Sequence, residues 1–205
     1  IVSSDLSSPH YPKLAGLLVQ QGRTKEAIAL MLQRQQRVPQ DDTIAIQTLE
    51  FLYALDTNES SSTLQAFLRS PLGQQPRFLE SLLQRATAWK IEPTQHLPFY
   101  ERLCAIPPLR ASCFSRWGKL LWTLHRRAEA YATWRRIESL QPPSARDLFS
   151  LALLLLQHER GTDSIPILER VLALAPKHTR ARLHLAQELL KAGDPKKQAD
   201  ALFRR

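Results

Sequence analysis

A recurring proline is the feature that most constrains how this chain can fold. Pro39, Pro107, Pro142 and Pro176 each follow an amphipathic stretch, and they are separated by 68, 35 and 34 residues. The common step is 34 residues: the first separation is twice this length, and the second is one residue longer than it. Proline ends helices because it cannot continue their hydrogen bonding, and a fixed step of this size is typical of repeat architectures. The sequence therefore predicts repeating units of about 34 residues that each end near a proline.

The units align at their apolar positions. Positions 4, 7, 8 and 11 of each unit are mostly apolar and lie on one face of a helix; in the fourth unit they are Phe114, Trp117, Gly118 and Leu121. The small residue at position 8 would let a second helix approach closely. A second apolar stripe follows in the second half of each unit, so each unit is predicted to be a helix–turn–helix. The predicted repeats are residues 8–41, 42–75, 76–110, 111–144, 145–178 and 179–205, of which the last is partial.

This pattern resembles the tetratricopeptide repeat (TPR) family over nearly the whole chain. The resemblance implies an all-α fold, a right-handed superhelical solenoid of antiparallel helix pairs, and here a single array over residues 1–205. In that family the first helix of each pair lines a concave groove, and stacked repeats bury a continuous core. The function that the resemblance implies is binding of a protein or peptide in the groove.

The second and third repeats depart from the family pattern. The second has Thr48 at a core position, and a polar segment, DTNESSST, suggests a long turn between its helices. The third lacks a turn glycine and contains Pro93 and Pro98, which predict a short or displaced second helix. The sixth repeat is clear in its first helix only.

Charge is distributed unevenly along the chain. Residues 1–102 contain ten Lys or Arg and ten Asp or Glu, whereas residues 103–205 contain eighteen and nine, so the whole net charge of +9 lies in the second half. Such asymmetry indicates an acidic partner or a solvated basic face rather than a particular fold. The hydrophobic share of 43% can bury a substantial core.

Several function classes have no support in the sequence. It contains no phosphate-binding loop, no GxSxG and no HExxH, so we expect no enzyme activity, no catalytic residues, no cofactor and no metal. His158 and Glu159 are interpreted as a solvated turn. No run of 18 apolar residues occurs, so no membrane insertion is expected within the chain. Cys104 and Cys113 fit either two incidental thiols or one disulfide in an oxidising compartment.

Residues 114–143 contain three of the four tryptophans among many arginines. Interleaved aromatic and basic residues can bind a nucleic acid strand. However, Trp117 and Trp134 fall at positions where the TPR family has core residues, so few aromatics remain to stack on bases, and nucleic acid is disfavoured as a partner. Trp122, at position 12, would instead face the groove or pack against the neighbouring repeat. Arg135 and Arg136 are predicted to lie on an outer face.

The groove of the fourth to sixth repeats is the predicted binding site. Its groove-facing positions combine basic residues with apolar ones, which suits an acidic peptide or protein that also has apolar anchors. An alternative is that the basic excess only keeps the protein soluble. The predicted partner-binding residues are Arg116, Lys119, Trp122, Arg146, Phe149, Arg180, His184 and Lys191.

The sequence thus predicts a non-enzymatic protein–protein interaction scaffold. Because the chain begins at Ile1 and its only methionine is Met31, we expect it to be a segment of a larger protein. The family resemblance suggests a bacterial envelope or secretion assembly and a soluble periplasmic location, with the cytoplasm as the alternative. The alternative is a substrate-recognition module attached to an enzyme such as a glycosyltransferase.

Overall fold

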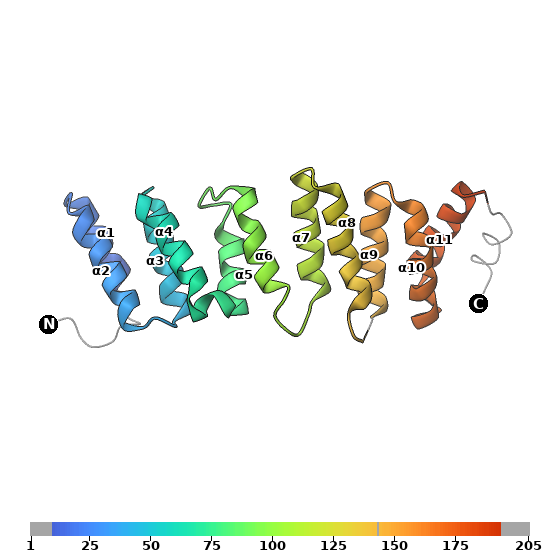
Figure 1. Cartoon of the computed structure of the whole chain (residues 1–205), viewed down its shortest axis with the longest axis horizontal. Helices are drawn as coiled ribbons and strands as arrows, with labels where there is room; N and C mark the ends of the chain where they lie inside the picture. The colour runs from blue at the N-terminus through green and yellow to red at the C-terminus, as the bar shows by residue number, and fades with distance from the viewer. Residues whose placement is uncertain (1–9, 143, 194–205) are drawn as a thin grey trace. The chain divides into compact units, whose positions relative to one another are not determined.

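The computed structural model describes residues 10–142 and 144–193, and every regular element in that part of the chain is a helix (Figure 1). Consecutive helices are joined by short turns and pack side by side as antiparallel pairs. The all-α fold of antiparallel helix pairs predicted from the sequence is confirmed. The chain divides into two compact units, Ile1–Ile106 and Pro107–Arg205, and each is described by itself. The single array over residues 1–205 stays a prediction.

The first unit contains three helix pairs. Each helix packs against its partner, and α2 packs on α3 as α3 does on α5. A buried cluster of Ala15, Ala27 and Met31 joins the first pair, and Phe51 of the next pair packs against it. In chain order the elements are α1 (His10–Gln20), α2 (Thr24–Arg37), α3 (Asp42–Ala54), α4 (Asn58–Arg69), η1 (Pro71–Gln74), α5 (Pro76–Arg85), η2 (Pro93–His96) and α6 (Leu97–Leu103).

The second unit contains two helix pairs and a further first helix. Within it α7 packs on α8, α8 on α9, α9 on α10 and α10 on α11, and α7 also contacts α9. Residues 194–205, which include the rest of the predicted sixth repeat, lie outside the described residues. The elements are α7 (Ala111–Thr123), α8 (Arg127–Arg135), η3 (Arg136–Ser139), α9 (Ala145–Gln157), α10 (Gly161–Leu174) and α11 (Thr179–Lys191).

The turn that follows the first helix of each repeat contains one residue in the left-handed backbone region. Only glycine adopts this conformation without a steric cost, yet four of the six residues are not glycine. Their spacing is 34 residues throughout, except for one step of 35, which matches the predicted period. They are Gly22, Asp56, Lys90, His125, Glu159 and Gly193.

The two divergent repeats differ in how well they were predicted. The prediction of a long turn in the second repeat is wrong, because most of that segment is helical: α4 begins at Asn58. The buried Leu64 and Leu68 of α4 hold this helix against the core. Thr48 is fully buried, and its hydroxyl donates a hydrogen bond of 2.8 Å to the Ile44 carbonyl. In the third repeat the second helix, α6, is indeed short, with seven residues.

Close packing between α7 and α8 explains the small residue at position 8. Gly118 faces the indole of Trp134, which is fully buried and donates from Nε1 to the Ser115 carbonyl at 3.3 Å. Trp134 is therefore a core residue, as predicted. Trp117 is only half-buried, although its Nε1 atom is buried without a hydrogen-bond partner. Arg136 is exposed, as expected, but its guanidinium lies 5.5 Å from the centre of the Trp117 ring.

Two further predictions can be compared with the structure. Among the described residues, no helix is long and apolar enough to cross a membrane. Cys104 and Cys113 are both buried, and neither is a free thiol.

Candidate functional site

The residues predicted to bind a partner lie on α7, α9 and α11, the first helices of their repeats, all in the second unit. The five basic side chains among them are exposed, and the three ring-bearing side chains are half-buried. Exposed charge beside partly accessible rings is the composition expected of a peptide-binding surface. The exposed residues are Arg116, Lys119, Arg146, Arg180 and Lys191; the half-buried ones are Trp122, Phe149 and His184.

Phe149 connects α9 with the start of α11. Its ring centre lies 4.4 Å from that of His178 and 6.0 Å from that of His184. His178 is held in place because its Nδ1 accepts a hydrogen bond of 3.1 Å from the Ala181 backbone and so caps α11. The structure thus brings the rings of two predicted site residues, Phe149 and His184, close together.

Lys191 is less available to a partner than the sequence suggested. Its Nζ donates to Glu188 Oε1 at 2.5 Å, and the Glu188 side chain is almost fully buried. The Glu188 carboxylate also lies beside Gly161, at the first residue of α10, where a negative charge is favourable because of the helix dipole. Lys191 is therefore paired with Glu188, although 72% of its side chain stays exposed.

Trp122 belongs to an aromatic cluster at one end of the α7–α8 and α9–α10 pairs. The cluster consists of Trp122, Tyr131, Trp134 and His158. The His158 ring centre lies 4.3 Å from that of Trp122 and 4.7 Å from that of Trp134. The Tyr131 hydroxyl donates to the His158 carbonyl at 2.7 Å. Trp122 therefore packs against the next repeat, while its half-exposed part can still contact a ligand.

Two guanidinium groups lie over rings of this cluster. Arg127 is 5.0 Å from the centre of the Trp122 ring, and Arg160 is 4.7 Å from that of Tyr131. Arginine stacks on aromatic faces through its planar, weakly hydrated charge. Arg160 also pairs with Asp163, at 3.5 Å. The outer edge of the cluster is therefore positively charged.

The interpretation of His158 as a solvated turn residue is wrong, because its imidazole packs against two indoles and is half-buried. Burial lowers the pKa of His158, and the positive charge of Lys119 lowers it further. Both effects favour the neutral ring at neutral pH. Its neighbour Glu159 is exposed, as expected for a turn. Sequence reasoning missed the cluster because His158 is 36 residues from Trp122, just beyond one repeat.

A similar ring contact occurs in the first unit. Tyr53 is at position 12 of the second repeat and Trp89 is at position 14 of the third, as Trp122 and His158 are in the fourth and fifth. The Tyr53 and Trp89 rings are stacked, with centres 5.1 Å apart and an interplanar angle of 6°. Contact between position 12 and position 14 of the next repeat is thus a structural feature that recurs in this chain.

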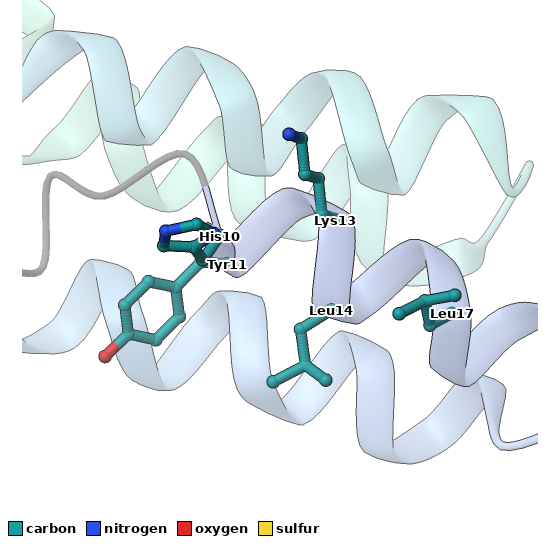
Figure 2. A pocket seen from close by; sticks show the side chains of 5 residues that line it. All are labelled: His10, Tyr11, Lys13, Leu14 and Leu17. Atoms are coloured by element: carbon teal, nitrogen blue, oxygen red, sulfur yellow. The ribbon is translucent and has the colours of Figure 1, made fainter. Parts of the chain in front are cut away.

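A separate surface with a cavity of about 390 Å³ occurs on α1 in the first unit. Figure 2 shows its lining side chains, with His10 and Tyr11 at one end of the helix and Leu17 at the other. Leu14 and Leu17 are 39% and 55% exposed. At the same repeat positions, Leu151 and Leu154 are buried. The lining is apolar apart from His10 and Lys13, and it contains no arrangement that indicates catalysis.

The described residues offer little for metal chemistry. In that part of the chain no three His, Cys, Asp or Glu side chains are grouped so that they could hold a metal ion.

No protein-family model and no curated protein matches the chain. Its fold is similar to solved structures at low identity. PilW, a widely conserved type IV pilus biogenesis factor, is 12% identical, with a TM-score of 0.48 over 97% of this chain and 91% of that one. YrrB, a TPR protein with an unusual peptide-binding site, is 15% identical, with a TM-score of 0.46 over 90% and 94%. A thermophilic TPR protein of Thermus thermophilus, TTC0263, is 20% identical, with a TM-score of 0.40 over 88% and 98%.

Proposed function

We propose that this chain is a non-enzymatic protein-interaction scaffold that binds a peptide or partner protein on the first helices of its second unit. One observation carries the proposal: exposed basic side chains and half-buried rings alternate on α7, α9 and α11. The partner is acidic with apolar anchors. Its charges speed association and fix its orientation, whereas contacts with rings such as Phe149 supply much of the binding energy.

The test begins by selecting ligands without assuming their sequence. Random twelve-residue peptides displayed on phage are selected on the full chain, and the expected winners are rich in Asp and Glu beside apolar residues. The binding of one selected peptide is then compared between Arg146→Glu, on α9, and Arg135→Glu, on α8. Both residues are exposed, and both variants change the net charge equally, so a difference in peptide binding cannot come from net charge.

The expected result is slower association with Arg146→Glu and wild-type association with Arg135→Glu. The rate of the wild type should also fall with added salt, because charges on the surface are screened. Equal loss in both variants would mean that net charge alone attracts the peptide. Loss only in Arg135→Glu would place the binding face on the second helices and overturn the proposal.

We also propose that the chain is a periplasmic segment of a larger bacterial envelope or secretion assembly protein. Neither Cys104 nor Cys113 is a free thiol, and this supports the proposal because proteins of oxidising compartments keep few free thiols. Alkylation of thiols in intact host cells, with and without prior reduction, tests it. Both cysteines should react only after reduction. Full reactivity without reductant would place the protein in a reducing compartment and contradict the proposal.

A further inference from the structure

Two cations beside Trp122 lack a carboxylate partner within the part of the chain that the structure describes: Lys119 and Arg127. The neighbouring basic residues of the same turns differ. Arg126 pairs with Glu129 at 2.5 Å, and Arg160 pairs with Asp163. The chain therefore supplies acidic partners to the surrounding arginines but leaves these two charges available.

Arg127 is also held in a defined orientation. Its guanidinium lies over the Trp122 ring, and that ring is fixed in turn by His158 and Trp134. A guanidinium that lies over an aromatic ring keeps its N–H groups for other acceptors, because the ring face does not replace a carboxylate. The N–H groups form a planar fork that matches the two oxygens of a carboxylate. An arginine that is already stacked loses less conformational freedom when it binds.

Lys119 lies one helical turn before Trp122 on α7, and residues three apart face the same side of a helix. It is near enough to His158 for its charge to lower the pKa of that imidazole. A second cation thus lies on the same side of the cluster as Trp122.

We propose that Arg127, which lies over the Trp122 ring, and Lys119, one helical turn before Trp122 on α7, form a binding subsite for a carboxylate group of the partner peptide. Arg127 takes both carboxylate oxygens through its fork, Lys119 adds a second positive charge, and the exposed edge of Trp122 contacts the neighbouring apolar side chain of the peptide. The inference rests on the proposed function, because it names the part of the second unit where an acidic side chain of the partner is held.

The experiment uses the full chain and two blocked peptides as probes, acetyl-Gly-Glu-Leu-Glu-Gly-amide and the same peptide with both Glu replaced by Gln. Binding is followed by NMR through the indole N–H signals and the histidine ring signals, and the Trp122 signal is assigned with Trp122→Phe. The Glu peptide should shift the signals of Trp122 and His158, and the Gln peptide should not.

Arg127→Lys is the decisive variant, because it keeps the charge but removes the planar fork. We expect it to weaken binding of the Glu peptide about tenfold, the change expected when a charge-assisted hydrogen bond is lost. Arg135→Lys, on the same helix, is the matched control and should bind like the wild type. Lys119→Gln should weaken binding less. The thermal unfolding midpoint of each variant checks that the fold is retained.

Other results would overturn the subsite and would separate it from the wider proposal. If the Glu peptide shifts only the ring signals of His184, and Arg127→Lys has no effect, the subsite is wrong but the first helices still bind acidic peptides. If both peptides bind equally, the contact is apolar and the carboxylate assignment is wrong. If neither peptide shifts Trp122 at millimolar concentration, the subsite is also wrong, and the phage selection still decides the proposed function.

Discussion

The contact between Gly118 and Trp134 gives the sharpest test of how the helix pairs are held together. A Cβ atom at Gly118 would lie 2.1 Å from Nε1 and 2.3 Å from Cδ1 of the Trp134 indole. Carbon atoms in contact prefer about 3.5–4.0 Å, so Gly118→Ala requires the indole or the helix to move by more than about 1 Å. The indole is fully buried and hydrogen-bonded to Ser115 on α7. Moving the indole away from α7 would weaken that bond.

The expected size of the effect combines two opposing contributions. Alanine favours a helix interior over glycine by about 1 kcal/mol. Overpacking a buried contact costs about 1–3 kcal/mol, and the weakened hydrogen bond of Trp134 costs about 1 kcal/mol more. Together these predict that Gly118→Ala lowers the free energy of unfolding of the second unit by about 1–3 kcal/mol.

Gly16 provides a matched control, since it also lies inside a first helix, α1, but a Cβ there would meet nothing within 4 Å. Gly16→Ala should therefore raise the free energy of unfolding by about 0.5–1 kcal/mol. Both variants are measured by urea unfolding, followed by circular dichroism and by tryptophan fluorescence, which reports mostly on the second unit. If Gly118→Ala stabilises the protein as much as Gly16→Ala does, the close approach of α7 and α8 is not what the structure indicates.

Three further predictions concern stability. Burial lowers the pKa of His158 and of His96, so the unfolded chain takes up these protons first. The free energy of unfolding should then fall as the pH drops from 7.5 to 5 through the ordinary histidine pKa of about 6.5, and His158→Gln should reduce that dependence in urea titrations. Glu159 has a left-handed backbone, so Glu159→Gly should raise the free energy of unfolding and Glu159→Ile should lower it, by roughly 1 kcal/mol each; equal thermal unfolding midpoints of the two variants would contradict the backbone assignment. Leu17→Ala should change the free energy of unfolding by less than about 0.5 kcal/mol because Leu17 is 55% exposed. Leu154 lies at the same repeat position and is buried, so Leu154→Ala should lower the free energy of unfolding by about 2–5 kcal/mol. If Leu17→Ala lowers it by a similar amount, α1 is covered in solution.

Features that depend on the 34-residue period were predictable from sequence. The proline step located the repeats, and the apolar stripes located most of the helices, because burial on one helix face imposes a periodic pattern. The segment DTNESSST was misread because its polar residues resemble a turn. In the structure the helix there is held by its later residues Leu64 and Leu68, and local composition does not report such tertiary contacts.

The candidate site was predictable in position but not in detail. Repeat alignment places a side chain on the first helices, but it cannot show which neighbours that side chain meets. The ion pair between Lys191 and Glu188 and the stacking of Arg127 on Trp122 depend on rotamers and on adjoining helices. The His158 ring was misread for the same reason, because its partners come from other repeats.

The recurrence of the ring contact changes how experiments on Trp122 should be interpreted. Because Tyr53 and Trp89 stack in the equivalent place, the contact between Trp122 and His158 stabilises adjoining repeats whether or not a ligand is present. Removing the Trp122 ring would therefore loosen α7 against the following repeat and impair binding on α9 and α11 indirectly. Loss of binding in Trp122→Ala is thus no evidence of a ligand contact. Only Arg127→Lys, which retains both the ring and the charge, separates recognition of a carboxylate from the stability of the repeat stack.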